Sequence, residues 1–409
     1  MLIPHHAVVL GQAQHADAYT VARQAAVAAL QQLPVGTSPG WALVICGGQH
    51  APEELLRGFR AALGSIPLVG GCAAGLITAT GVSMSGHACG LLLFSADLAP
   101  LTLRVVDGLD QDEAAAGRQL GAMLAGLPDP GPVLLFYDSV KSIEPLDVHI
   151  CSRLLDGLYT GLDDTSAPVL LGAGMLDDLR FSSSYIFDGQ NVRRHAALAV
   201  VLPSQLHAHI AITHGCYPVS DFLEITAIDG ARVLELDGQP ALALVAARLG
   251  TSREALAARQ PLLSLTLGEK HGDPFAPFND RQYVNRLVMA ADLRSDALIL
   301  FEADFQRGSR VQLMLYDPAR MFESARQQTT ALLAALGKRE PLFGLYIDCA
   351  GRSTAFSGLH DDETAPIRQQ VATRCPLLGF YSGVEIAPIL DRARPLDWTG
   401  VLALFTVHA

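Results

Sequence analysis

Two charged residues that follow long apolar runs could carry binding chemistry. Arg352 follows the run 341–347, and Glu385 follows the apolar segment 376–381 and a glycine. A guanidinium can hold a carboxylate through two parallel hydrogen bonds and a carboxylate can hold an amine, so together they suit a zwitterion such as an amino acid. The alternative is that Arg352 and Glu385 pair with each other and lock two loops, which adds little net stability.

A cysteine near these charges offers a different chemistry. Cys349 follows Asp348 and lies three residues before Arg352, and a nearby cation can lower a thiol pKa and create a nucleophile. A catalytic thiol also needs a base, usually histidine. Thirteen histidines are scattered along the chain, so a candidate base always exists and the signal has little specificity. A buried free cysteine at a strand end is the favoured interpretation.

Histidine groups that could bind a metal are few. The dense groups are His5-His6, His207-x-His209 and His214. His207 and His209 would share one face of a strand, but no cysteine or carboxylate cluster completes a tetrahedron. A structural zinc site is therefore not expected, and the metal question stays open.

Motifs for other chemistries are weak. Asp138-Ser139 and His149 contain the residue types of a catalytic triad, but no nucleophile-elbow pattern surrounds the serine. The sequence also has no phosphate-binding loop pattern. A haem needs only an axial ligand and an apolar pocket, so composition does not exclude it. The Cys375-Pro376 pair is of a sort found at some haem-responsive thiolates, although a core cysteine before a strand explains it equally.

Three segments with one shared order must position these residues. Each segment has an apolar run, a helix candidate, and a second apolar run that proline opens and glycine closes, over 41–75, 132–174 and 341–383. A further apolar strand follows each, at 87–94, 195–202 and 398–405. Such runs are typical of strands buried on both faces. Three matches in the same order indicate a repeated β-α-β-β unit.

The ends of these strands are the expected binding positions. Ligands collect beyond the carboxyl ends of parallel strands, where side chains and helix N-termini converge. The strand-end residues that we select as ligand-binding candidates, besides Arg352, Glu385 and Cys349, are Asp138, Cys72 and Tyr381.

The chain divides into an extension and two larger regions. Residues 1–35 form a strand and a helix that Asp17 can cap, packed on the core. Residues 36–203 and 213–407 form two related domains. Between the second and third units, 213–242 alternates β-branched residues with two Asp-Gly turns, which is typical of an antiparallel meander. The fold class is mixed α/β (α+β), with sheets in the centre and helices outside.

Composition restricts the partners. The 409 residues carry a net charge of −12, which disfavours a nucleic-acid groove. Half of the residues are hydrophobic, yet the apolar runs are far shorter than the ~20 residues of a membrane span. The N-terminus lacks the pattern of a signal peptide. Seven cysteines without regular spacing indicate reduced thiols and a cytoplasmic location.

Several of these segments resemble the FIST domain (F-box and intracellular signal transduction proteins). PLVGGCAAGLITATG with HACGLLLF, and GAGMLDD with YIFDGQNVRRHAALAVVL, are similar to its N-terminal region. The meander and YVNRLVMAADLRSDALILFEADFQRGSRVQLMLYD are similar to its C-terminal region. The C-terminal motifs Cys-x-x-Arg and Gly-Phe-Phe/Tyr-x-x-Gly-Glu-Ile are matched at 349–352 and 379–386. Val384 replaces the glycine before Glu385, which puts the backbone shape of that loop in question.

The resemblance implies sensing rather than catalysis. It implies a ligand such as an amino acid, bound between the two domains, and Arg352, Glu385, Cys349 and Arg286 as residues that face it. It also implies that the protein acts as input to a signalling pathway, with a separately encoded histidine kinase as a possible partner. Some family members are haemoproteins that respond to nitric oxide, which makes haem the alternative ligand. A Cys349-dependent enzyme and a scaffold without ligand are the remaining alternatives.

Overall fold

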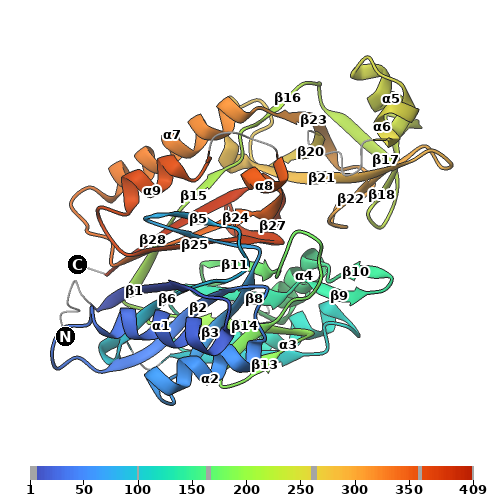
Figure 1. Ribbon diagram of the computed structural model, residues 1–409. Coiled ribbons are helices and arrows are strands. Elements are labelled where there is room, and N and C mark those ends of the chain that lie inside the picture. The colour runs from blue at the N-terminus through green and yellow to red at the C-terminus, as the bar shows by residue number, and fades with distance from the viewer. Residues whose placement is uncertain (1–6, 99–100, 163–166, 259–264, 358–361, 408–409) are drawn as a thin grey trace.

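Three β-rich units with the same order of elements surround a common core in the computed structural model (Figure 1). The structure describes residues 7–98, 101–162, 167–258, 265–357 and 362–407. The candidates His5 and His6 lie outside the described residues. Among those residues, no helix is long and apolar enough to cross a membrane.

Unit 1 contains two strand–helix pairs, a third strand, a hairpin and a last strand. Its elements are β1 (Val8–Gln14), α1 (Ala18–Leu30), β2 (Pro39–Gly47), α2 (Pro52–Leu63), β3 (Leu68–Ala73), β4 (Gly75–Thr78), β5 (Gly81–Ser83) and β6 (Ala88–Ser95). The short helix η1 (Ala96–Leu98) follows. Helix α1 begins as predicted, because the Asp17 carboxylate accepts a hydrogen bond from the Thr20 amide at 2.8 Å.

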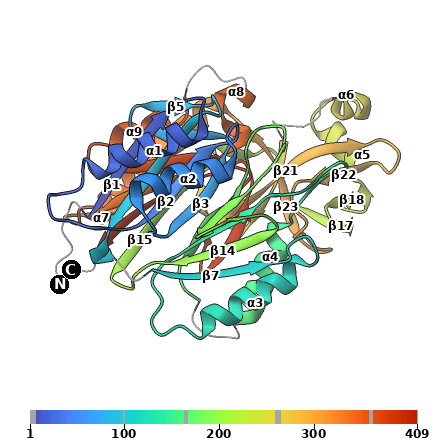
Figure 2. The same ribbon diagram turned by 60° about the horizontal axis from the view of Figure 1, so that its bottom comes forward.

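Unit 2 repeats this order and adds a small hairpin. Its elements are β7 (Thr102–Asp107), α3 (Glu113–Ala125), β8 (Val133–Asp138), the added β9 (Val140–Ile143) and β10 (Leu146–Val148), α4 (Cys151–Leu162), β11 (Leu170–Met175), β12 (Ile186–Gly189), β13 (Val192–Arg193) and β14 (Ala196–Val201). Glycines allow α3 and α4 to pack at very short range, since a Cβ on Gly121 would lie 2.1 Å from the Leu158 carbonyl oxygen. The two helices lie side by side outside β7 and β14 (Figure 2).

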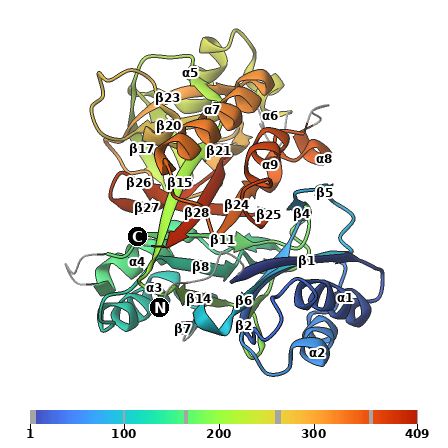
Figure 3. The same cartoon turned by 90° about the vertical axis from the view of Figure 1, so that its left-hand side faces the viewer.

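Unit 3 has the same order, but a long insert separates its first strand from its first helix. Its elements are β15 (Leu206–Thr213), α7 (Pro318–Leu336), β24 (Phe343–Cys349), η3 (Ala350–Arg352), α8 (Thr354–Ser357), α9 (Ala365–Val371), β25 (Leu377–Ser382), β26 (Val384–Ile389), β27 (Arg392–Leu396) and β28 (Gly400–Val407). Helices α7 and α9 cover the outer face of its sheet (Figure 3).

The insert is an antiparallel sheet with two short helices. Its elements are β16 (Cys216–Pro218), β17 (Leu223–Asp229), β18 (Arg232–Leu236), β19 (Gln239–Pro240), α5 (Ala241–Arg248), α6 (Arg253–Ala257), β20 (Leu265–Lys270), η2 (Asp280–Gln282), β21 (Tyr283–Asp292), β22 (Ala297–Leu300) and β23 (Arg310–Tyr316). The predicted meander is confirmed, because β17 pairs with β18 and β18 with β19, all antiparallel.

The three sheets have equivalent strand orders, and each is completed by a hairpin from another unit. The orders are β1-β6-β2-β3-β12-β13, β7-β14-β8-β11-β26-β27 and β15-β28-β24-β25-β4-β5. The hairpin β4–β5 of unit 1 thus completes the sheet of unit 3, the hairpin β26–β27 of unit 3 completes that of unit 2, and the hairpin β12–β13 of unit 2 completes that of unit 1. The central pairs β2–β3, β8–β11 and β24–β25 are parallel, and the other pairs in these three sheets are antiparallel.

The inner faces of all three sheets form one hydrophobic core. Ile45 of β2, Phe136 of β8 and Ile347 of β24 all belong to it, and each is fully buried. This arrangement confirms the mixed α+β class, the sheets within and the helices outside, and the three copies of one unit. The division into domains at 203 and 213 stays a prediction, and the hairpin β26–β27 crosses it to pair with β11.

Candidate functional site

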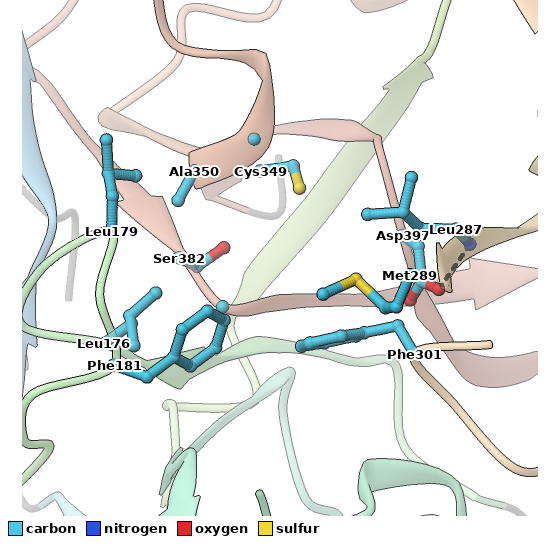
Figure 4. A pocket seen from close by; sticks show the side chains of 12 residues that line it. Leu176, Leu179, Phe181, Leu287, Met289, Phe301, Cys349, Ala350, Ser382 and Asp397 are labelled. Atoms are coloured by element: carbon cyan, nitrogen blue, oxygen red, sulfur yellow. Dashed lines mark hydrogen bonds between the residues drawn. The ribbon is translucent and has the colours of Figure 1, made fainter. Parts of the chain in front are cut away.

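A cavity lies where unit 2, unit 3 and the insert meet (Figure 4). It has a volume of about 60 Å³. Its lining is mostly apolar and comes from the segment after β11, from β21, from the residue after β22, and from the ends of β24, β25 and β27 and the residues that follow them. The lining residues are Leu176, Leu179, Phe181, Leu287, Met289, Phe301, Cys349, Ala350, Gly351, Ser382, Gly383 and Asp397. We call it the Cys349 cavity.

Three side chains supply its polar atoms. Cys349 and Ser382 end the parallel strands β24 and β25 and face each other across the register, and Asp397 follows β27. The thiol of Cys349, the hydroxyl of Ser382 and the carboxylate of Asp397 therefore stand around an apolar space. A few placed polar groups in an apolar hollow are typical of small-molecule sites.

The Cys349 thiol is a poor nucleophile in this setting. Burial raises its pKa well above the ordinary value, and the Glu385 carboxyl adds to the shift. Backbone hydrogen bonds from Gly351 and Trp398 oppose the increase without overcoming it. The thiol is consequently neutral near pH 7, whereas catalytic thiols have a lowered pKa.

Arg352 lies behind the cavity and is held by unit 3 itself. It is fully buried, its Nη1 donates to the Thr213 carbonyl at 2.6 Å, and its Nε lies 3.1 Å from Asp348 Oδ1. The alternative in which Arg352 pairs with Glu385 is wrong, because the guanidinium pairs with Asp348. Neither Arg352 nor Glu385 is among the residues that line the cavity.

Tyr381 belongs to the same buried network. Its hydroxyl donates to Glu363 Oε1 at 3.0 Å. Burial, reinforced by the nearby Asp348, raises the pKa of Glu363 to about 9. Burial also raises the pKa of Asp348, although Arg352 opposes this shift. The Glu363 carboxyl is therefore protonated at neutral pH.

Glu385 reaches the cavity through a neighbour. Its Oε1 accepts a hydrogen bond from the Ser382 hydroxyl at 2.8 Å, and its Oε2 accepts one from the Thr399 amide at 3.4 Å. Burial raises the pKa of Glu385 well above its usual range, against the Ser382 hydrogen bond. Glu385 therefore contacts the lining of the cavity only through the Ser382 hydroxyl.

Arg286 connects the insert to unit 3. Its Nε and Nη2 donate to the two carboxylate oxygens of Asp304 at 2.6 and 2.5 Å, and its Nη1 and Nη2 donate to the Pro395 carbonyl. Its Nη1 also lies 3.6 Å from Asp397 Oδ1. The Leu287 amide donates to Asp397 Oδ2 at 2.9 Å (Figure 4). Burial raises the pKa of Asp397 to about 6.

Glu302 connects the insert to unit 2. Its carboxylate accepts hydrogen bonds from the amides of Cys151 and Ser152, both at 3.0 Å, and from the Ser152 hydroxyl at 2.7 Å. These donors are at the start of α4, where orphan amides and the helix dipole favour a negative charge. Burial raises the pKa of Glu302 to about 7, although Arg286 opposes this shift.

The remaining two predicted residues, Cys72 and Asp138, are not among the residues that line the cavity. Cys72 is buried in unit 1, where its sulfur accepts a hydrogen bond from the Tyr185 amide at 3.3 Å and burial raises its pKa. Asp138 ends β8 and accepts hydrogen bonds from the amides of His195 and Ala196 at 2.7 and 2.9 Å. Burial raises the pKa of Asp138 to about 6.

Of the seven predicted residues, only Cys349 lines the cavity. Sequence reasoning missed Ser382, Asp397, Glu363 and Glu302. Ser382 could have been found, because it precedes the glycine that ends its apolar run. The other three carry no pattern of their own, since the fold alone brings them beside Arg352 or Arg286.

Two mycobacterial proteins are similar to part of this chain. An uncharacterized protein from Mycobacterium tuberculosis strain H37Rv is 24% identical over 255 residues, 62% of this chain and 64% of the relative. An uncharacterized protein from Mycobacterium bovis is 25% identical over 245 residues, 59% of this chain and 61% of the relative. The matches therefore span about three fifths of these relatives.

One solved structure aligns along almost all of the chain at a low score. It is a crystal structure of cyanuric acid hydrolase from A. caulinodans, with 11% identity, a TM-score of 0.34, and coverage of 98% of this chain and 99% of that one.

Two family descriptions match most of the sequence. The FIST N domain matches residues 40–239 and the FIST C domain matches residues 241–388. FIST domains are generally sensors in signal transduction. This chain therefore belongs to the FIST family.

Proposed function

We propose that this protein is a sensor whose small ligand binds in the Cys349 cavity and changes how the insert sits against units 2 and 3. The observation that carries the proposal is the origin of the lining: Phe181 belongs to unit 2, Cys349 to unit 3 and Met289 to the insert. Ligand binding transmits a signal only when affinity differs between two arrangements of the protein. A ligand in a cavity shared by three parts would lose contacts if the insert moved, and this loss would give the difference in affinity.

The chemistry of the lining favours a small amphipathic amine. An amino-acid-like metabolite stays within the proposal, although none of the described lining residues is a cation that could hold its carboxylate. Asp397 offers a carboxylate for an ammonium group, and Ser382 offers a hydroxyl that can donate or accept. The leucine, methionine and phenylalanine side chains suit a short apolar group. At about 60 Å³, the cavity is smaller than the roughly 300–1,000 Å³ of sites for drug-sized ligands.

Transmission would pass through buried charges. Asp397 holds the Leu287 amide and faces Arg286, while Glu302 follows the lining residue Phe301 and holds the first turn of α4. An ammonium group beside Asp397 would compete with Arg286 for this carboxylate. The contact between the insert and unit 3 would then change with occupancy.

The haem alternative does not fit this cavity. Its volume is far below that of a haem, and none of the described residues that line it is histidine. A histidine kinase as partner remains part of the proposal, to be tested by phosphorylation assays with and without ligand. An enzyme acting through Cys349 is less favoured, because burial raises the pKa of its thiol.

The direct test is thermal unfolding of the purified chain with single amino acids and short-chain amines. Binding to the native state alone raises Tm by mass action. The variant Ala350→Leu fills the cavity, because Ala350 lines it, and Ala61→Leu on the exposed face of α2 is the matched control. We expect a Tm increase in the wild type and the control, and none in Ala350→Leu. An increase that persists in Ala350→Leu would contradict the proposal.

A further inference from the structure

We propose that Asp138, His149 and His195 bind a divalent transition-metal ion such as Zn²⁺, at a corner of unit 2 that is separate from the Cys349 cavity. Asp138 ends β8, His149 follows β10, and His195 immediately precedes β14. One potential ligand atom of each residue lies within 4.8 Å of the other two. We call these three residues the His149 corner.

The two imidazoles already have nearly the spacing that a metal requires. His149 Nε2 and His195 Nδ1 are 3.1 Å apart. Two nitrogens bound tetrahedrally to zinc at ~2.0–2.1 Å each would lie about 3.3 Å apart. The nitrogens therefore need to separate by only a few tenths of an ångström to admit an ion between them.

Asp138 can supply the third ligand without losing its present partners. Each of its oxygens accepts one backbone amide, from His195 and Ala196. A carboxylate has about four lone-pair sites, so acceptor capacity remains. The same hydrogen bonds hold His195 in a left-handed conformation with φ of 50°, which for a residue other than glycine is a strain found at functional sites.

Glu113 provides the outer support typical of metal-bound histidines. Its Oε1 lies 3.5 Å from His149 Nδ1, on the opposite side of the ring from His195. A carboxylate there favours the proton on Nδ1, so that Nε2 accepts the hydrogen bond from His195 Nδ1 and can bind a metal ion once that shared proton is displaced. Lys141 Nζ is 3.7 Å from the same Glu113 oxygen and balances its charge.

The charge and exposure of the corner suit a divalent ion. Asp138 and His149 are buried, and His195 is half-buried. The corner brings the carboxyl groups of Asp138 and Glu113 beside the two imidazoles. The partial exposure of His195 leaves the corner accessible from solvent. Two histidines, one carboxylate and one open position are typical of reactive metal sites.

The test is equilibrium dialysis of the metal-stripped full-length chain against Zn²⁺, followed by titration with Co²⁺. We expect one ion per chain, and a Co²⁺ complex with visible d–d absorption and no thiolate charge-transfer band. His149→Gln and His195→Asn should each weaken binding by at least ~100-fold, and Glu113→Gln by ~10–100-fold. Asparagine suits position 195 because it tolerates a positive φ.

The matched control is His87→Asn. His87 immediately precedes β6 in unit 1, as His195 precedes β14 in unit 2, so this variant should bind like the wild type. Circular dichroism checks that each variant is folded. If a variant is not folded, the Co²⁺ spectrum of the wild type still tests the proposal. Failure to bind Zn²⁺ below 100-micromolar concentrations would overturn the proposal. Binding that survives in both folded histidine variants, or a thiolate charge-transfer band, would also overturn it.

Discussion

The carboxyl ends of β8 and β24 occupy equivalent places in their sheets but carry different side chains. In the parallel pair β8–β11, the register runs from Val133–Leu170 to Asp138–Met175, five residues further along. In β24–β25 it runs from Gly344–Leu377 to Cys349–Ser382, also five residues further along. Asp138 and Cys349 thus occupy equivalent positions. His195 and Trp398 also correspond, with φ of 50° and 56° just before β14 and near the start of β28.

The difference between the two corners lies in what surrounds these equivalent positions. The Cys349 cavity is apolar, and buried ion pairs of Arg352 and Arg286 stand behind it. The His149 corner is polar and opens toward solvent through His195. One repeated scaffold therefore supports two kinds of site, and their function has to be argued from their side chains.

The largest expected effect tests the ion pair behind the Cys349 cavity. Arg352→Met should lower the free energy of unfolding by about 3–5 kcal/mol, because Asp348 is left buried without its cation. Urea denaturation measures the change. The control Arg326→Met removes an exposed pair with Glu323 and should leave the denaturation midpoint almost unchanged, because solvent screens such pairs. Equal costs would mean that burial does not distinguish these pairs.

The two equivalent strand ends can be compared by replacing one side-chain atom at each and measuring the loss of stability. Asp138→Asn should cost about 1–3 kcal/mol, because an NH₂ group replaces one acceptor of the His195 and Ala196 amides. Cys349→Ser keeps an acceptor beside Gly351 and Trp398 and should cost less. Denaturant midpoints of the two variants decide the order, and a larger loss for Cys349→Ser would break the proposed equivalence.

The buried carboxyl of Glu363 predicts a pH dependence that the His149 corner does not share. Its pKa of about 9 in the folded chain exceeds the ordinary 4.5, so the folded state holds a proton that the unfolded state has lost. The free energy of unfolding should fall as pH rises from 7.5 to 9, by at most about 1.4 kcal/mol per pH unit for this proton. In Glu363→Gln the slope should decrease by that amount, and an unchanged slope would place the proton elsewhere.

The smallest effect concerns thiol reactivity. Cys349 and Cys375 are each 7% exposed, and burial raises the pKa of both thiols. Iodoacetamide labelling followed by mass spectrometry should modify Cys349 no faster than Cys375. Much faster modification of Cys349 would revive the enzyme hypothesis and sharpen the contrast with the His149 corner.

The repeated unit could be predicted because it depends on local patterns. Apolar runs located β8 and β24, second runs that proline opens and glycine closes located β11 and β25, and Asp17 located the start of α1. The turn-rich stretches after the parallel pairs were recognised as turns, but their pairing partners were not. Hairpin β26–β27 pairs with β11, more than 200 residues earlier in the sequence, and no local signal specifies such a contact.

The sequence by itself determined the repeat, the mixed fold class, the family and the position of Cys349 at a strand end, because each is written in contiguous residues. Only the tertiary structure decided that Arg352 pairs with Asp348, that Asp397 and Ser382 share a cavity with Cys349, and that His149 meets His195. Those contacts join segments that are distant in the chain. Their energies depend on burial and mutual distance, which no residue carries alone.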